Sequence, residues 1–204
     1  MRYLILTFLI LMPFRASAIE PSTQQLVINT QDILRGHFVE ERNLKGFNAP
    51  IKTQGHFVVA PAHGLIWQIE KPLPTATVIT PSGLVQTIAG AKVMFLPAQK
   101  VPFLLHLYDM LGGALAGNWK PLETEFVVTK SDNEDGWEVT LVPRRKDNPA
   151  MPYGSITVSG HRFVENVTLL KTDGDSDTLA FDNEALSSAP PLATETVAFN
   201  SVHP

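Results

Sequence analysis

Apolar and polar residues alternate along most of this chain, in short segments separated by Gly, Pro, Asn and Asp. A period of two indicates β-strands with one buried face, and the Thr, Val, Phe and Trp in these segments also favour strands. Many short strands at regular spacing predict an antiparallel sandwich or barrel. The segments with this pattern are 37–44, 53–60, 65–70, 76–80, 84–88, 92–96, 124–129, 136–142, 155–159, 162–170 and 178–181.

Two segments follow a helical pattern instead, so the fold class that we expect is mainly β (α+β). Residues 22–35 begin with Ser22 and Gln25 at capping-box spacing, and Gly36 predicts the end of that helix. The segment 102–116 is apolar around more than half of a helical circumference. This pattern is compatible with a buried core helix or with a helix that covers a hydrophobic opening, and it does not separate the two.

The N-terminus has the layout of a secretory signal peptide at residues 1–18. Arg2 precedes an apolar run at 3–14, and the small residues of 16–18 follow at a peptidase site. The run is too short for a permanent membrane helix, and no later segment has 18 uninterrupted apolar residues. We therefore expect an exported protein without a stable membrane anchor, with one domain at 19–185. The tail 186–204 is rich in Ser, Ala and Pro, which predicts disorder or one edge strand at 196–199.

Composition narrows the possible partners. The chain has no cysteine, which excludes disulfides and thiol metal ligands. Its net charge is −4, and loss of Arg2 and Arg15 with the signal makes the remainder more acidic. An acidic surface argues against nucleic acid as a partner. We expect a monomer.

Motifs for catalysis and cofactor binding are absent from the sequence. It contains no Gly-x-Ser-x-Gly, no P-loop, no Gly-x-Gly-x-x-Gly and no His-Glu-x-x-His. His56 and His63 flank an apparent hairpin, but two histidines without a nearby carboxylate make a weak metal site. We therefore expect no enzyme, no cofactor and no metal, although a triad assembled from distant residues can escape sequence inspection.

One acidic segment has two interpretations. Asp173, Asp175, Asp177 and Glu184 match positions 1, 3, 5 and 12 of a calcium loop, but Thr178 replaces the glycine required at position 6. The flanking segments also read as strands. An ordinary solvated hairpin turn is the favoured interpretation, and calcium is the alternative.

Large apolar residues at alternate positions are the main candidates for a function. Such a face is usually core, but a curved sheet can also enclose a cavity for an apolar ligand. The candidate cavity residues come from the strands and from the segment 102–116. They are Phe38, Phe57, Val59, Leu65, Trp67, Ile69, Val78, Leu84, Phe103, Leu107, Met110, Trp137, Val139, Leu141, Ile156 and Val158.

Several short motifs in order, over roughly residues 22–185, resemble one known family. Each is weak alone, and the set is more specific because of its order, spacing and signal peptide. The motifs are Phe38-x-Glu40-x-Arg42, Gly55-x-Phe57-x-Val59, Gly64-Leu65-x-Trp67, Thr80-Pro81-x-Gly83-Leu84 and Gly174-Asp175-x-x-Thr178-x-x-Phe181. Together they resemble the LolA family of outer-membrane lipoprotein carriers, in a divergent LolA-like branch.

The resemblance implies an incomplete antiparallel β-barrel covered by a lid of a few helices. It also implies a carrier of lipoprotein acyl chains that accepts cargo from an inner-membrane exporter and delivers it to an outer-membrane acceptor. One departure concerns the lid. The family's lid arginine precedes the proline of the strand before the tryptophan, and here Ala60 stands before Pro61. A different lid latch, or a cargo other than lipoproteins, would explain this difference.

The expected function is therefore a periplasmic carrier that binds an acylated lipoprotein or lipid in a hydrophobic cavity. The alternative is an envelope scaffold module that binds another protein and holds no lipid. A filled core with an exposed partner patch would favour the scaffold.

Overall fold

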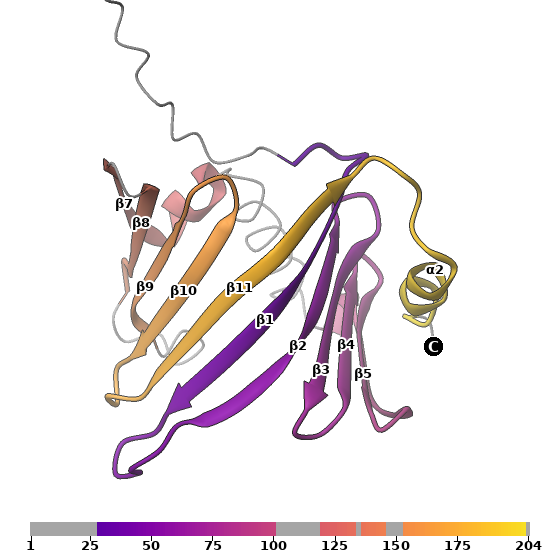
Figure 1. Cartoon of the computed structure of the whole chain (residues 1–204), viewed down its shortest axis with the longest axis horizontal. Helices are drawn as coiled ribbons and strands as arrows, with labels where there is room; N and C mark the ends of the chain where they lie inside the picture. The colour runs from indigo at the N-terminus through magenta and orange to yellow at the C-terminus, as the bar shows by residue number, and fades with distance from the viewer. Residues whose placement is uncertain (1–27, 101–118, 134–135, 146–152, 203–204) are drawn as a thin grey trace, which may run out of the picture.

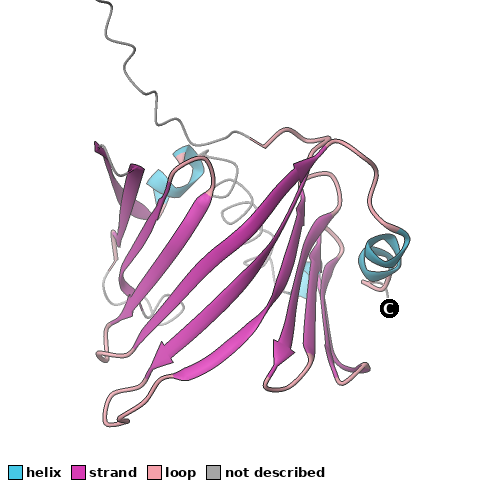
Figure 2. Ribbon diagram, in the orientation of Figure 1, coloured by secondary structure: helices cyan, strands magenta, loops and turns pink. Residues whose placement is uncertain are grey.

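The computed structural model describes residues 28–100, 119–133, 136–145 and 153–202. Eleven strands form one sheet, and they account for most of the described chain (Figure 2). The strands are β1 (Ile33–Asn43), β2 (Ile51–Ala60), β3 (Gly64–Lys71), β4 (Thr75–Thr80), β5 (Gly83–Ile88), β6 (Ala91–Pro97), β7 (Phe126–Asn133), β8 (Gly136–Pro143), β9 (Tyr153–Gly160), β10 (Val164–Lys171) and β11 (Ser176–Ser187). The short helices η1 (Ala98–Lys100) and η2 (Lys120–Thr124) and the helix α2 (Ala193–Asn200) complete the described elements.

The sheet is antiparallel, strongly curved and open. Its order is β6-β5-β4-β3-β2-β1-β11-β10-β9-β8-β7, so β6 and β7 are the two edges. The chain runs outward through six strands on one side, and the last strand, β11, returns to pair with β1 at the centre (Figure 1). The predicted mainly β fold, an incomplete antiparallel barrel, is therefore confirmed.

The two faces of the sheet hold separate apolar clusters. On the concave face, one cluster covers β1–β5 around Phe38 and Phe57, and a second covers β7–β10 around Trp137 and Val139. Phe181 of β11 packs against both, so the concave apolar surface is continuous across the middle of the sheet. The third cluster lies on the convex face beneath α2.

The C-terminal segment is a helix and not the predicted disordered tail or edge strand. Helix α2 lies outside the curved sheet (Figure 1), where it buries Phe199, and Val202 just beyond its end is buried as well. These side chains contact the convex cluster that includes Val58, Ile66 and Val85. Among the helices of the described residues, none is long and apolar enough to cross a membrane.

The predicted helix at 22–35 is wrong over the part that the structure describes. Residues 28–32 form a turn, in which the Asp32 carboxylate accepts hydrogen bonds from the Asn29 backbone N–H and the Ser188 hydroxyl. Strand β1 then begins at Ile33 and continues through Gly36, the expected helix stop. Pairing on both sides, with β2 and β11, overrides the local helical pattern. Residues 22–27, the segment 102–116 and the signal at 1–18 lie outside the described residues.

Candidate functional site: the concave apolar face

Four aromatic rings from four strands meet at the centre of the concave face. Phe38 of β1 stacks on Trp67 of β3, with ring centroids 3.8 Å apart and an interplanar angle of 23°. Phe57 of β2 lies nearly parallel to Trp67 at 6.3 Å. Phe181 of β11 meets Phe57 edge-on at 5.5 Å and Trp67 at 6.2 Å. Stacked and edge-on pairs are the favoured aromatic geometries, so this cluster is a well-ordered apolar platform.

Glycines opposite the aromatic rings make room for this cluster. In the β1–β2 register, Gly36 pairs with Phe57, and Phe38 pairs with Gly55. The Phe57 ring lies across Gly36 so closely that a Cβ there would be 2.7 Å from the ring atoms Cε1 and Cζ. The residue that we expected to end a helix therefore allows an aromatic ring to lie flat against the strand.

The apolar surface continues on the other side of β11. Trp137, Val139 and Leu141 of β8 are buried there with Val158 of β9. Trp119, just before η2, lies against Trp137 with ring centroids 6.0 Å apart. The surface thus extends from β5 to β7 on one side of a sheet that curves around it.

The structure brings most of the predicted cavity residues onto this one face. Twelve of them belong to or pack against the two concave clusters: Phe38, Phe57, Val59, Leu65, Trp67, Ile69, Leu84, Trp137, Val139, Leu141, Ile156 and Val158. Val78 is the exception, because it pairs with Ile66 and Val85 and belongs to the convex cluster beneath α2. Phe103, Leu107 and Met110 lie outside the described residues.

This face also contains Ile79, Trp119 and Phe181, which the sequence pattern did not identify. In β4, Val78 and Ile79 are adjacent and both buried, so periodicity alone could not assign the inward residue. Trp119 does not belong to a strand, and no periodic signal marks it. Phe181 could have been recognised, since it ends the last motif of the family resemblance.

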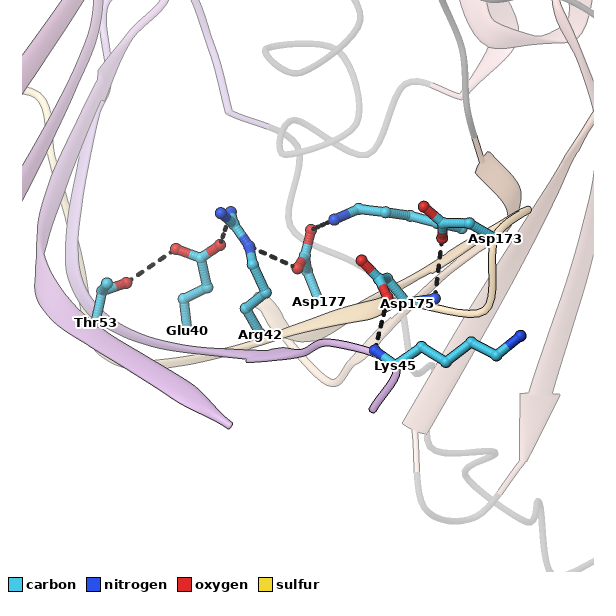
Figure 3. A network of polar contacts seen from close by, with 8 residues as sticks. Glu40, Arg42, Lys45, Thr53, Asp173, Asp175 and Asp177 are labelled. Atoms are coloured by element: carbon cyan, nitrogen blue, oxygen red, sulfur yellow. Dashed lines mark hydrogen bonds and ion pairs between the residues drawn. The ribbon is translucent and has the colours of Figure 1, made fainter. Parts of the chain in front are cut away.

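Figure 3 shows a row of charged and polar side chains joined by hydrogen bonds and ion pairs. This row lies beyond one end of the apolar platform. Along β1, the residues after Phe38 on the same face are Glu40 and Arg42. Arg42 binds Asp177 through Nε at 2.9 Å and Glu40 through Nη2 at 3.0 Å. Thr53 donates its hydroxyl to Glu40 at 2.9 Å, and Lys171 Nζ lies 2.9 Å from Asp177. Four strands, β1, β2, β10 and β11, contribute to this row.

The family of this protein follows from a match that covers most of the chain. Residues 18–161 match the family described as outer membrane lipoprotein carrier protein LolA-like. The chain belongs to this LolA-like family. No curated protein sequence matches the chain.

Solved structures that resemble this LolA-like protein have low sequence identity to it. A LolA superfamily protein from Nitrosomonas europaea is 8% identical, with 84% of this chain and 92% of that chain covered and a TM-score of 0.39. LprF from Mycobacterium bovis is 15% identical, with coverages of 80% and 89% and a TM-score of 0.37. In the Pseudomonas aeruginosa MucA/MucB complex, the matched chain is 15% identical, with coverages of 81% and 55% and a TM-score of 0.36.

Glu184 is a partly buried carboxyl group of this LolA-like chain. Its Oε1 is buried and has no hydrogen-bond partner in the part of the chain that the structure describes. Burial raises the pKa of Glu184 above its ordinary value, and the negative charges of Glu165 and Asp182 act in the same direction. This carboxyl is therefore easier to protonate than an exposed glutamate.

The acidic segment of the LolA-like chain forms a hairpin turn between β10 and β11. Asp173 accepts the Asp175 backbone N–H, Asp175 accepts the Lys45 backbone N–H, and Asp177 binds Arg42 and Lys171. Glu184 lies seven residues beyond Asp177 along an extended strand, a distance of about 23 Å. These contacts favour the hairpin interpretation over a calcium loop. Within the described ranges, no three His, Asp or Glu side chains gather as a metal site.

Three of the described histidines each contact a different partner. His56 contacts Glu70 at 2.9 Å, His161 contacts Glu165 at 3.0 Å, and the His63 ring stacks on Phe199. His56 and His63 thus have different neighbours and do not form the weak metal pair that their spacing suggested.

A cavity of about 430 Å³ lies on the opposite side of the sheet, between α2 and the convex face. Its lining includes Arg35, His56, Ile66, Gln68 and Glu195. It is open to solvent and mixes charged with apolar groups, unlike the concave face.

Proposed function

We propose that this protein is a periplasmic carrier that holds the acyl chains of a lipoprotein, or of another acylated lipid, on its concave face. The observation that carries the proposal is the continuous apolar surface from β5 to β7, centred on the stacked Phe38–Trp67 pair. Membership of the LolA-like family supports it. The curvature of the sheet supports it too, because a bent open sheet can surround a flexible chain without closing a solid barrel.

The physical need for such a surface follows from the cost of exposing acyl chains to water. Each buried methylene contributes about 0.8 kcal/mol to membrane retention, so a lipid with two or three chains does not cross an aqueous space unaided. An apolar carrier surface replaces the bilayer during transit. The cycle needs no catalytic step, since relative affinities of exporter, carrier and acceptor direct the transfer. The apolar segment at 3–14 and the small residues at 16–18 would export the chain to this compartment.

Native mass spectrometry of protein purified from the periplasm tests the proposal directly. We expect additional mass from bound acyl species, which detergent exchange removes and a synthetic diacylated lipopeptide restores. Ile69→Glu places a charge on the half-buried edge of the aromatic platform and should reduce lipopeptide binding at least tenfold. Val197→Glu is the matched control, because Val197 is 70% exposed on α2 outside the sheet and the same substitution there should leave binding unchanged.

Two results would overturn this proposal. One is wild-type protein that carries no acyl species and binds no lipopeptide. The other is equal lipopeptide affinity in the Ile69→Glu and Val197→Glu variants, provided circular dichroism shows both to be folded. Recovery of a membrane protein partner without lipid would favour the scaffold alternative.

A further inference from the structure

The charged row beside the apolar platform has an uneven distribution of hydrogen-bond donors and acceptors. Glu40 accepts from Arg42 at Oε1 and from Thr53 at Oε2. Asp177 accepts from Arg42 at Oδ1 and contacts Lys171 at Oδ2. All four carboxylate oxygens of the row therefore already have a partner within it.

Arg42, in contrast, has N–H donors that the contacts within the row do not use. A guanidinium carries five N–H groups, and the contacts described for Arg42 use Nε and one Nη2 hydrogen. Its side chain is 46% exposed, whereas those of Glu40 and Asp177 are only 17% and 10% exposed. The accessible part of the row is therefore a donor surface, because the cation covers the carboxylates beneath it.

The row lies at a fixed distance from the aromatic platform and on the same face. Arg42 follows Phe38 by four residues along β1, which places it about 13 Å away along the strand. Pairing of Phe38 with Phe181 and of Arg42 with Asp177 keeps both positions inward on the neighbouring strand as well. One amphipathic molecule can therefore contact both, with its tail on the rings and its head at Arg42.

We propose that the row Thr53–Glu40–Arg42–Asp177–Lys171 is a head-group subsite for the acyl ligand. It selects head groups with hydrogen-bond acceptor oxygens, namely ester, amide, carboxylate or phosphate oxygens, and Arg42 donates to them. This inference rests on the proposed function and adds an orientation to it. The ester and amide carbonyls that join acyl chains to a lipid or a lipoprotein have this chemistry.

Ligands with one tail and three head groups test the subsite. The probes are dodecanoate, 1-dodecanoylglycerol and dodecyltrimethylammonium, which offer a carboxylate, an uncharged ester and a cation without acceptors. Affinities are measured below micelle formation by isothermal titration calorimetry at constant ionic strength. Arg42→Gln should weaken the first two ligands about tenfold and leave the third unchanged or slightly tighter.

Lys52→Gln is the matched control for charge. Lys52 pairs with Glu41 on the same two strands, one position along in the register and therefore on the opposite face. The Lys52→Gln substitution removes one positive charge from the same end of the sheet. We expect it to change the affinity for each probe less than twofold. Arg42→Lys keeps the charge but loses the planar fork, so it should recover part of the dodecanoate affinity and little of the ester affinity.

The outcomes separate this inference from the carrier proposal. If all three ligands bind and Arg42→Gln weakens none of them, or weakens all three equally, the head-group subsite is overturned while the carrier proposal stands. If none of the three binds the wild-type protein while the diacylated lipopeptide does, only the head-group subsite is overturned. If the lipopeptide fails to bind as well, both proposals are overturned. If Arg42→Gln weakens the binding of dodecanoate alone, Arg42 acts through its charge. That result would contradict hydrogen-bond donation from Arg42 to neutral carbonyl oxygens.

Discussion

Arg35 in β1 and Glu195 in α2 are 160 residues apart in the chain and form a two-pronged ion pair, with both N–O distances 2.7 Å. Glu195 also accepts the Leu192 backbone N–H at 2.8 Å, so the same carboxylate caps the first turn of α2. Its side chain is only 8% exposed. The pair fastens the C-terminal helix to the central strand of the sheet, directly opposite the aromatic platform.

Replacement of Glu195 should destabilise the fold. Glu195→Gln keeps the side-chain shape but loses the charge, which leaves Arg35 without its anionic partner. We expect the free energy of unfolding to fall by about 1.5–3 kcal/mol, the range for hydrogen bonds to charged groups, as measured by urea denaturation. Glu41→Gln is the control, since Glu41 is in an exposed pair with Lys52 and should cost less than about 0.5 kcal/mol. Equal losses in the two variants would contradict a specific role for the Arg35–Glu195 pair.

The same pair predicts the acid sensitivity of the fold. The hydrogen bonds from Arg35 lower the pKa of Glu195 below its ordinary value. A depressed carboxyl pKa contributes stability above the unfolded pKa, about 4.3 for glutamate, and this contribution is lost as the pH falls through the folded pKa. The stability difference between wild type and Glu195→Gln should therefore be full at pH 7 and should shrink below about pH 4. Melting temperatures of both proteins across this range check the prediction, and a constant difference would refute it.

Packing of the Phe57 ring on the concave face should allow no side chain at Gly36. An alanine Cβ there would lie 2.7 Å from two Phe57 ring atoms and 3.2 Å from the Asp182 carbonyl oxygen. Phe57 is itself buried against Trp67 and Phe181, so a shift of its ring would disrupt these contacts and cost free energy. We expect Gly36→Ala to cost about 1–3 kcal/mol of unfolding free energy and to change Trp67 fluorescence.

Gly154→Ala provides the comparison for this prediction. Gly154 is also a strand glycine, but the nearest atom to an added Cβ, the Leu170 carbonyl oxygen, is 3.7 Å away, an ordinary contact distance. The Gly154 variant should therefore be nearly as stable as wild type. A Gly36 variant of equal stability, with unchanged fluorescence, would show that the Phe57 ring does not depend on this glycine.

The sequence alone predicted the strand faces, because these depend on the alternation of neighbouring residues. It did not predict the features that depend on contacts with residues distant in the chain. Trp67 with Leu65 and Ile69, and Trp137 with Val139 and Leu141, were assigned to one face each because a strand places every second residue on the same side. The segment at 196–199 looked like an edge strand, but burial of Phe199 against the convex face makes it helical. Val78 was placed wrongly because its neighbour Ile79 is also apolar, and only the register with Leu65 shows which of them faces inward.

Calcium should leave the stability of this protein unchanged. A calcium site needs several carboxylate oxygens that converge on one point, and Asp177 instead holds Arg42 and Lys171 while Asp173 and Asp175 accept backbone N–H groups. Binding would require these contacts to break before any ion was coordinated. Differential scanning fluorimetry with 5 mM CaCl₂ against 5 mM MgCl₂ should therefore give equal melting temperatures. A ligand at one hundred times its Kd would add about 2.7 kcal/mol, a shift of several degrees, so a calcium-specific rise of that size would restore the calcium-loop interpretation.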